Sequence, residues 1–171
     1  MLTRKPKPVL YRRKREQKTD YGKRLHLLLA NKPRLVVRMT NQKLIGQLVE
    51  FTPQGDKVLE SVDSFALKKL GWTHSCKNFP AAYLTGLLLG RKIQKRKIKE
   101  AVLDTGFINP LKKGKIYAFL KGGIDGGLNV PHHPDILPDE SRVKGKHIQN
   151  KAKPEEIAGL FEQVKKKILS L

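Results

Sequence analysis

An excess of positive charge is the property that most restricts what this chain can fold into. The sequence has 36 lysines and arginines against 15 aspartates and glutamates, which gives a formal net charge of +21 over 171 residues. Like charges repel one another in a compact chain, and a bound polyanion relieves that repulsion. Hydrophobic residues still make up 39% of the chain, enough for a core, so a wholly disordered basic tail is not predicted. We therefore expect a folded domain that binds an acidic polymer.

The positive charge is concentrated in three segments. Residues 1–38 hold thirteen lysines and arginines and only two acidic residues. Residues 91–99 contain six cations and residues 142–153 contain five, in both cases without an acidic residue. Because the segments are well separated, we expect a polyanion to contact several sides of the protein, driven by counterion release from phosphates. The alternative is that the basic runs are solvated faces or an import tail, but solubility needs a much smaller net charge.

Composition disfavours several other classes of protein. The single cysteine, Cys76, rules out a disulfide framework and a cysteine-based zinc site. No apolar run approaches the length of about 18 residues needed to span a membrane, and the start of the chain lacks the apolar stretch of a signal peptide. The basic stretch 11–18 has only Tyr11 as a large apolar side chain, which disfavours a membrane-surface helix. We expect an intracellular, cytoplasmic protein.

Hydrophobic periodicity predicts a single mixed α/β domain. Alternating or continuous short apolar runs predict strands, at residues 34–40, 44–51, 57–62, 101–103 and 128–130. Helical spacing predicts helices, at residues 64–70, 78–96, 116–128 and 154–167. A further helix is expected from residue 11, interrupted at Gly22 and resuming over 23–30. Strands that alternate with helices after an initial meander indicate a mixed sheet.

The chain divides into three predicted regions. Residues 1–32 form a basic RNA-binding arm and helix, residues 33–131 form the α/β core, and residues 132–171 form a basic loop and a C-terminal helix. Within the first region, residues 1–10 are expected to be extended, and a leucine run is expected to dock the following helix on the core. Gly86 and Gly90 are expected to let the long helix approach the sheet closely.

The residues form no convincing catalytic or metal-binding pattern. Asp63, Asp104 and Asp125 could converge on a divalent metal ion, as in nucleases with mixed sheets, but turn and cap roles are the simpler interpretation. His132 and His133 point apart if they are extended, and no cluster supplies four ligands. We predict no catalytic residue, no metal site and no cofactor.

Two further features keep two interpretations open. The glycine-rich segment 122–127 lacks the Lys-Ser/Thr pair of a phosphate-binding loop, so it is expected to allow close packing of a helix or close approach of RNA. Trp72 and Phe79 could stack on a base or lie in the core. Cys76 is expected to be structural.

Five motifs occur in the order found in one known protein family. They span residues 19–38, 81–88, 100–104, 120–131 and 138–148. TDYGKRL begins the first motif, and LKGGIDGGLNVP is the fourth. On these motifs the chain resembles the large-subunit ribosomal proteins of the L-eighteen family, archaeal/eukaryotic type, which bind 5S rRNA. The resemblance covers about residues 5–150, and residues 151–171 match no motif of the family.

The resemblance implies a structural protein rather than an enzyme. The implied fold is a three-layer α/β arrangement of the ribonuclease-H-like motif, with a five-stranded mixed sheet whose second strand runs antiparallel. The implied role is to bind 5S rRNA and attach it to the central protuberance of the large subunit. The implied partners are 5S rRNA, 23S rRNA and other large-subunit ribosomal proteins, with no membrane and no DNA. An RNA-processing nuclease and a DNA-compacting protein are the competing classes.

The same resemblance assigns much of the 5S rRNA contact to the N-terminal segment. There Asp20 is expected to cap a turn or orient an arginine, and Tyr21 to stack on a base or dock on the sheet. The predicted RNA-binding residues combine this segment with later cations: Arg4, Lys5, Arg12, Arg13, Lys14, Arg15, Lys18, Thr19, Tyr21, Lys23, Arg24, Lys43, Arg142, Lys144, Lys146 and His147.

Overall fold

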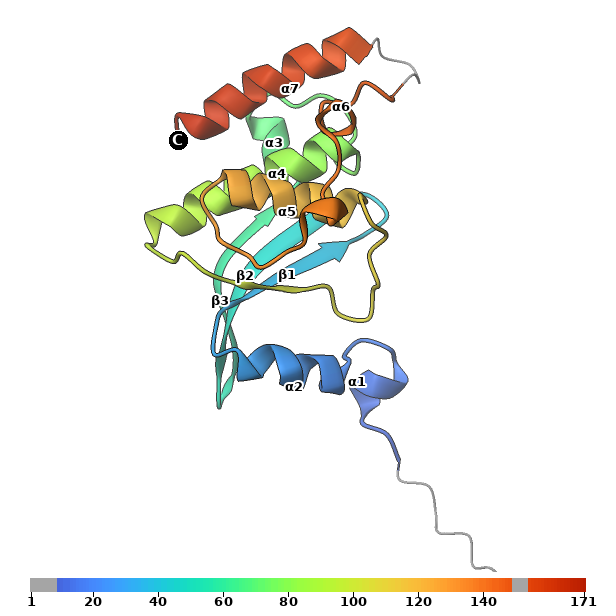
Figure 1. Cartoon of the computed structure of the whole chain (residues 1–171), viewed down its shortest axis with the longest axis vertical. Helices are drawn as coiled ribbons and strands as arrows, with labels where there is room; N and C mark the ends of the chain where they lie inside the picture. Colours follow the sequence, from blue (N-terminus) through green and yellow to red (C-terminus); the bar gives the residue numbers. More distant parts are fainter. Residues whose placement is uncertain (1–8, 149–153) are drawn as a thin grey trace, which may run out of the picture.

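Figure 1 shows a computed structural model of the chain, in which one β-sheet separates two short helices from several longer ones. The structure describes residues 9–148 and 154–171. The sheet has four strands in the order β3-β2-β1-β4. Strand β2 is antiparallel to both neighbours, whereas β1 and β4 are parallel, so the sheet is mixed as predicted. The strands are β1 (Arg34–Met39), β2 (Leu44–Thr52), β3 (Gly55–Asp63) and β4 (Val102–Asp104).

The meander β1–β3 follows the apolar alternation of its sequence. Leu35 and Val37 on β1 and Leu48 on β2 are almost fully buried on one face of the sheet. Thr40 closes the turn between β1 and β2, because its hydroxyl accepts a 3.0 Å hydrogen bond from the backbone N–H of Lys43. The antiparallel pairing of β1 with β2 and of β2 with β3 confirms the three predicted strands of the meander.

The predicted strand at 128–130 is wrong. Asn129 makes only an isolated parallel bridge to Glu100, so the segment adds one residue pair beside β4 instead of a fifth strand. The reason is local, since Gly127 with φ +97° ends the preceding helix and Pro131, which has no N–H, follows soon after. Too few residues remain between them to build a ladder.

Two parallel helices cover one face of the sheet. Helix α4 (Phe79–Lys95) confirms the helix predicted over 78–96, and it begins where the Asn78 side chain accepts a 2.8 Å hydrogen bond from the backbone N–H of Ala81. Helix α5 (Lys115–Asp125) packs along α4 so closely that no side chain separates the two backbones.

Glycines make this helix contact possible. A Cβ atom on Gly86 would overlap the backbone carbonyl of Phe119, and one on Gly122 would overlap the backbone carbonyl of Tyr83. A Cβ on Gly90 would lie 2.6 Å from the carbonyl oxygen of Gly123. The expectation that Gly86 and Gly90 approach the sheet is therefore wrong: they approach α5, and the glycine-rich segment serves helix packing.

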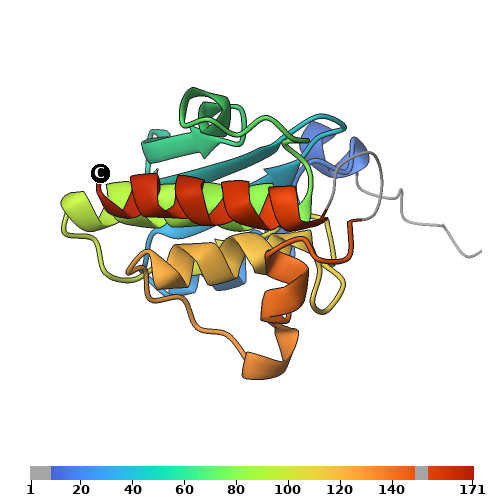
Figure 2. The same cartoon turned by 90° about the horizontal axis from the view of Figure 1, so that it is seen from above.

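Helix α7 (Pro154–Leu169) adds an outer layer. Seen from above, it lies over α4 (Figure 2). Its buried side chains recur with helical spacing on one face, at Ile157, Phe161, Val164 and Ile168. The Phe161 ring lies 5.4 Å from the Tyr83 ring of α4, measured between centroids. The predicted C-terminal helix is confirmed, and its apolar face joins the same core as the sheet and α4.

The remaining elements are short. Helix α3 (Ala66–Lys69) is shorter than its predicted range of 64–70, and the 3₁₀ helix η1 (Pro134–Ile136) and α6 (Glu140–Val143) interrupt the segment predicted to be irregular. Residues 149–153 of that segment lie outside the described residues. None of the described helices is both long and apolar enough to cross a bilayer.

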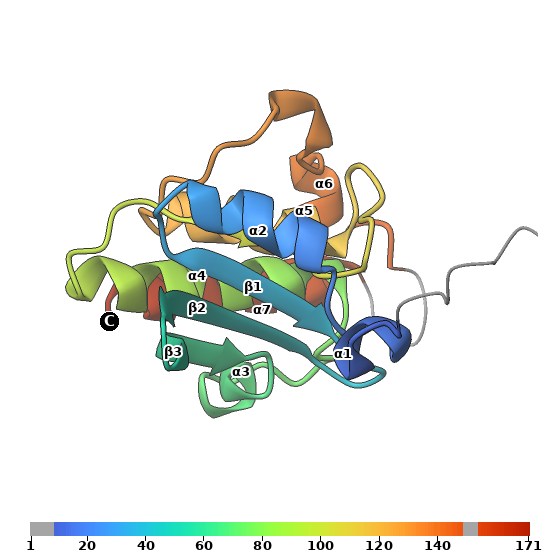
Figure 3. The same cartoon turned by 90° about the horizontal axis from the view of Figure 1, so that it is seen from below.

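Two N-terminal helices lie against the opposite face of the sheet (Figures 1 and 3). They are α1 (Arg12–Arg15) and α2 (Tyr21–Leu29), and Gly22 lies inside α2, so the predicted break at Gly22 is wrong. The chain turns at Gln17, which has φ +51°, and Asp20 then starts α2 by accepting a 3.1 Å hydrogen bond from the N–H of Lys23. Of the predicted extended arm, residues 1–8 lie outside the described residues.

Helix α2 rests on the sheet without entering the core. No residue of α2 is fully buried. Leu27 and Leu28 are half-buried, whereas Leu25 and Leu29 are 59% and 70% exposed. The leucine run therefore docks the helix only in part, and polar contacts must fix its position.

Candidate RNA-binding surface

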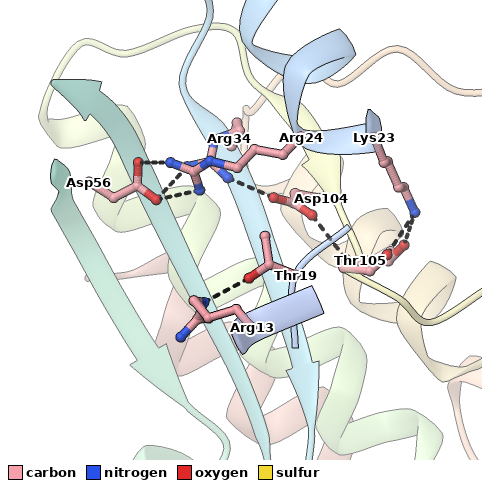
Figure 4. Close-up of polar contacts among 9 residues, drawn as sticks. Arg13, Thr19, Lys23, Arg24, Arg34, Asp56, Asp104 and Thr105 are labelled. Atoms are coloured by element: carbon pink, nitrogen blue, oxygen red, sulfur yellow. Dashed lines mark hydrogen bonds and ion pairs between the residues drawn. The ribbon is translucent and has the colours of Figure 1, made fainter. Parts of the chain in front are cut away.

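Helix α1 presents a dense group of cations to solvent. All four of its residues, Arg12, Arg13, Lys14 and Arg15, are basic and exposed. The Nε of Arg13 donates a 2.8 Å hydrogen bond to the hydroxyl of Thr19, which ties α1 to the segment that precedes α2 (Figure 4). Four adjacent guanidinium and ammonium groups on a fixed turn suit the phosphates of a nucleic acid.

An aromatic pair lies beside these cations. The rings of Tyr11 and Tyr21 are 5.3 Å apart between centroids and tilted by 56°. Tyr11 is 74% exposed and Tyr21 is 38% exposed, so parts of both rings face solvent. Of the two expectations for Tyr21, exposure of the ring beside Tyr11 fits stacking on an unpaired base or a sugar better than docking on the sheet.

A groove separates α1 and α2 from the open face of the sheet. Its volume is about 830 Å³, and its walls come from α1, α2, β1, β2, β3 and the loop after β4. Six cations line it: Arg13, Lys18, Lys23, Arg24, Arg34 and Arg38. Three carboxylates also line it, from Asp20, Asp56 and Asp104, so part of its positive charge is balanced internally.

Two arginines and two carboxylates form an ion network at one end of this groove (Figure 4). Arg24 of α2 donates two hydrogen bonds, of 2.8 and 2.7 Å, to the two oxygens of Asp56 at the tip of the β2–β3 hairpin. Arg34 of β1, only 3% exposed, donates to Asp56 and to Asp104, each over 2.7 Å. The hydrogen bonds from Arg24, and then those from Arg34, hold the pKa of Asp56 below its ordinary value. The network fixes α2 to the sheet where apolar contacts do not.

This network was not predicted from the sequence. Arg34 was counted only among the thirteen cations of residues 1–38, and Asp56 was not singled out. A signal was present, because a buried arginine at the start of an apolar strand requires a carboxylate partner. Which carboxylate would supply it depends on contacts between residues far apart in the sequence.

Lys23 makes a second attachment for α2. Its ammonium donates hydrogen bonds of 2.9 Å to the hydroxyl of Thr105 and 3.1 Å to the carbonyl of Gly106, in the loop after β4 (Figure 4). Lys23 and Arg24 thus hold the helix from two sides, while the cations of α1 remain exposed to solvent.

We expect Asp56→Asn to lower the free energy of unfolding at neutral pH by about 1–3 kcal/mol, because Arg24 and Arg34 lose a charged acceptor. The pKa of Asp56 is lower in the folded state, so its stabilisation is complete above the unfolded-state pKa and is lost as pH falls through the folded-state pKa. Thermal unfolding of the wild type and of the Asp56→Asn variant should therefore show a constant difference in the free energy of unfolding from about pH 5 to 8. This difference should shrink below about pH 4. Asp135→Asn is the control, since Asp135 is 79% exposed and its ion pair within residues 9–148 and 154–171 is with His133. If the difference in the free energy of unfolding stays unchanged below about pH 4, the ionised Asp56 carboxylate is not its cause.

Comparison with known proteins identifies the family. Residues 7–101 match the family described as "Ribosomal large subunit proteins 60S L5, and 50S L18". The chain is also 48% identical over 155 residues to the large ribosomal subunit protein uL18 of Korarchaeum cryptofilum (strain OPF8), covering 91% of this chain and 80% of that protein. The chain belongs to this family.

Membership in the L5/L18 family confirms several predictions made from the sequence. The protein is a structural constituent of the large ribosomal subunit in the cytoplasm and not an enzyme. The resemblance noted from the ordered motifs was correct, and rRNA binding is typical of the family.

The structure separates the predicted RNA-binding residues of this L18-family protein into groups. Arg12 to Arg24 gather around α1 and α2, whereas Lys43 lies in the β1–β2 connection and pairs with Asp63 over 2.6 Å. Arg142, Lys144, Lys146 and His147 lie in or after α6, on the other side of the sheet from α1 (Figure 1). Arg4 and Lys5 lie outside the described residues.

The residues considered for metal chemistry have ordinary structural partners. Asp63 binds Lys43, Asp104 binds Arg34, and Asp125 accepts a 2.6 Å hydrogen bond from the Tyr83 hydroxyl. In residues 9–148 and 154–171, no three His, Cys, Asp or Glu side chains are grouped to hold a metal ion.

Trp72 and Phe79, which could have stacked on a base or belonged to the core, both lie in the core. Trp72 is 1% exposed and Phe79 is 7% exposed, so neither presents a free ring face for a base. Cys76 is buried in the same core, and burial raises the pKa of its thiol, so we interpret it as a structural side chain.

Proposed function

We propose that this protein binds 5S rRNA and attaches it to the large subunit at the central protuberance, in contact with 23S rRNA and neighbouring ribosomal proteins. The observation that carries the proposal is the exposed run Arg12–Arg15 of α1, fixed beside a cation-lined groove. Membership in a family of large-subunit ribosomal proteins supports an RNA partner over DNA or a membrane.

The binding mechanism follows from the shape of RNA. The major groove of A-form RNA is too deep and narrow for side chains, so contacts fall on phosphates, 2′-hydroxyls and unstacked loop bases. The guanidinium groups of Arg12, Arg13 and Arg15 suit bidentate contact with phosphates, while Lys14 and Lys18 add charge. Tyr11 and Tyr21 offer ring surface to one unpaired base.

Within this proposal the N-terminal cations have two roles. The cations of α1 contact RNA. Lys23 instead donates hydrogen bonds to Thr105 and Gly106, and Arg24 donates to Asp56, so these two residues position α2. The proposed division of labour follows the sequence: residues 1–32 bind RNA, 33–131 form the ribonuclease-H-like core, and 132–171 extend it.

The experiment that tests the proposal is 5S rRNA binding at several salt concentrations. Six to ten phosphate contacts from the N-terminal surface would weaken binding by roughly a thousandfold or more between about 50 and 200 mM salt. Duplex DNA of similar length is the control and should bind far more weakly than 5S rRNA. Equal affinity for the two nucleic acids, or a flat response to salt, would refute the proposal.

A further inference from the structure

The two N-terminal helices have few contacts with the rest of the protein. We call residues 11–30, which include α1 and α2, the α1–α2 unit. Neither helix has a buried residue. In the part of the chain that the structure describes, the hydrogen bonds from this unit to the remaining residues come from the side chains of Lys23 and Arg24. Segments with so little buried surface open at a lower free energy than the core does.

Among these hydrogen bonds, those to Asp56 have a charged acceptor. The ammonium of Lys23 donates to the Thr105 hydroxyl and the Gly106 carbonyl, which are both neutral. Arg24 donates to both carboxylate oxygens of Asp56, over 2.8 and 2.7 Å. Bidentate arginine–carboxylate pairs are stronger than neutral hydrogen bonds and fix the geometry of both partners. The Asp56 carboxylate is therefore the strongest polar attachment of α2 to the sheet.

Arg34 fixes the Asp56 carboxylate on the sheet (Figure 4). Arg34 is 3% exposed, and its guanidinium donates hydrogen bonds of 2.7 Å to Asp56 on β3 and to Asp104 on β4. Because Arg34 belongs to β1, three strands of the sheet hold this acceptor in one orientation. A preoriented acceptor lowers the entropy that is lost when Arg24 binds it.

The position of Asp56 gives its charge two opposite effects on RNA binding. Its side chain is 31% exposed and lines the groove beside α1. A negative charge there repels phosphates and so weakens RNA binding directly. The same charge holds α2 on the sheet, and the hydrogen bond from Arg13 to Thr19 ties α1 to the segment before α2. The carboxylate therefore also fixes the exposed cations of α1 next to the groove.

The attachment of α2 has the larger of these two effects. Asp56 is paired with two arginines, whose positive charges offset its repulsion of the phosphates in a bound RNA. When the α1–α2 unit leaves the sheet, the cations of α1 and the groove no longer form one surface. The apparent affinity for RNA then falls in proportion to the fraction of molecules that have the unit in place.

We propose that Asp56 is a positioning residue for RNA binding, which strengthens binding although it carries the same sign of charge as RNA. It acts through Arg24 and keeps the α1–α2 unit on the sheet, without touching the RNA. This role rests on the proposed function, since the ligand is taken to be 5S rRNA.

The test compares full-length wild type with Asp56→Asn, which keeps the shape of the side chain and removes its charge. Affinity for 5S rRNA is measured over a range of salt, at a temperature where circular dichroism shows both proteins to be folded. We expect Asp56→Asn to bind about tenfold more weakly, with an unchanged slope of log affinity against log salt, because no phosphate contact is lost. Asp56→Glu restores the charge and should bind within about threefold of wild type.

Glu16→Gln is the matched control. Glu16 follows α1, and in the described part of the chain its ion pairs are with Arg12 and Lys18, inside the α1–α2 unit. Its loss removes the same charge from the same side of the protein but no attachment to the sheet. This variant should bind 5S rRNA as tightly as wild type or up to about threefold more tightly. Unchanged or tighter binding by Asp56→Asn, equally weak binding by Asp56→Glu, or an equal loss in the control would each overturn the inference.

Hydrogen exchange without RNA tests the attachment itself. An isolated helix as short as α2 is unstable in water, so its amides exchange once the α1–α2 unit leaves the sheet. The α2 amides should exchange faster than those of α4, and about tenfold faster again in Asp56→Asn. Equal exchange rates in α2 and α4 of this variant would show that the unit opens only with the core, which contradicts the positioning role. If wild type fails to bind 5S rRNA, the proposed function fails, and this exchange measurement still decides whether Asp56 holds α2.

Discussion

Gly122→Ala should leave the protein unfolded, or destabilise it by about 3–5 kcal/mol or more, although it adds a single methyl group. The added carbon would overlap the backbone carbonyl of Tyr83, and no rotamer change can move a backbone atom. Helices α4 and α5 would have to separate, exposing core residues such as Phe119 and Leu87. Urea denaturation followed by circular dichroism measures the loss.

Gly159→Ala is the matched control for this substitution. Gly159 lies in α7, and a Cβ atom there would have no heavy atom within 4 Å. Replacing glycine by alanine at an open helical position should stabilise the protein by up to about 1 kcal/mol. Similar destabilisation by both changes would show that glycine content, and not contact between the helices, decides stability.

Replacing Arg12, Arg13 and Arg15 together by alanine should weaken 5S rRNA binding by about 3–6 kcal/mol, with little change in melting temperature. Each charge-assisted bond to a phosphate contributes about 1.5–3 kcal/mol before neighbours compensate. None of the three side chains is buried, and their contacts within the protein are an exposed ion pair with Glu16 and a hydrogen bond to Thr19. Filter binding and thermal unfolding measure the two effects.

Leu84→Ala provides the opposite case. Leu84 is fully buried in α4, so its truncation should cost about 2–5 kcal/mol of folding stability. RNA affinity should then fall only as far as the folded fraction falls. If the triple arginine variant unfolds as readily as this leucine variant, α1 belongs to the core and its assignment to RNA is wrong.

Local sequence signals were sufficient for most of the fold. Alternation predicted β1 and β2 because one face of the sheet is buried, and helical spacing predicted α4 to within one residue at each end. The false strand at 128–130 arose because Leu128 and Val130 are buried, and burial alone does not make a ladder. Glycine spacing indicated a close approach but could not say which element approaches.

The candidate binding surfaces were predictable to different degrees. The N-terminal surface was visible because its cations are consecutive in α1. The group of cations around the Phe79 ring was seen only in part, because Lys77 and Lys115 are isolated in the sequence and come near Arg142 only after α4 and α5 pack. The Asp56 network was missed for the same reason, since its members are joined by the fold and not by spacing.

The contact between α4 and α5 also limits how proteins of this kind can diverge. A clash between two side chains is often relieved by a smaller residue on the other side, so pairs of positions can drift together. Here the atom nearest to a Cβ on Gly86, Gly90, Gly122 or Gly126 would be a backbone carbonyl oxygen, which every amino acid carries. A substitution on the facing helix therefore cannot make room for a side chain that replaces one of these glycines. Substitutions can accumulate around this helix contact, but only glycine fits at these four positions.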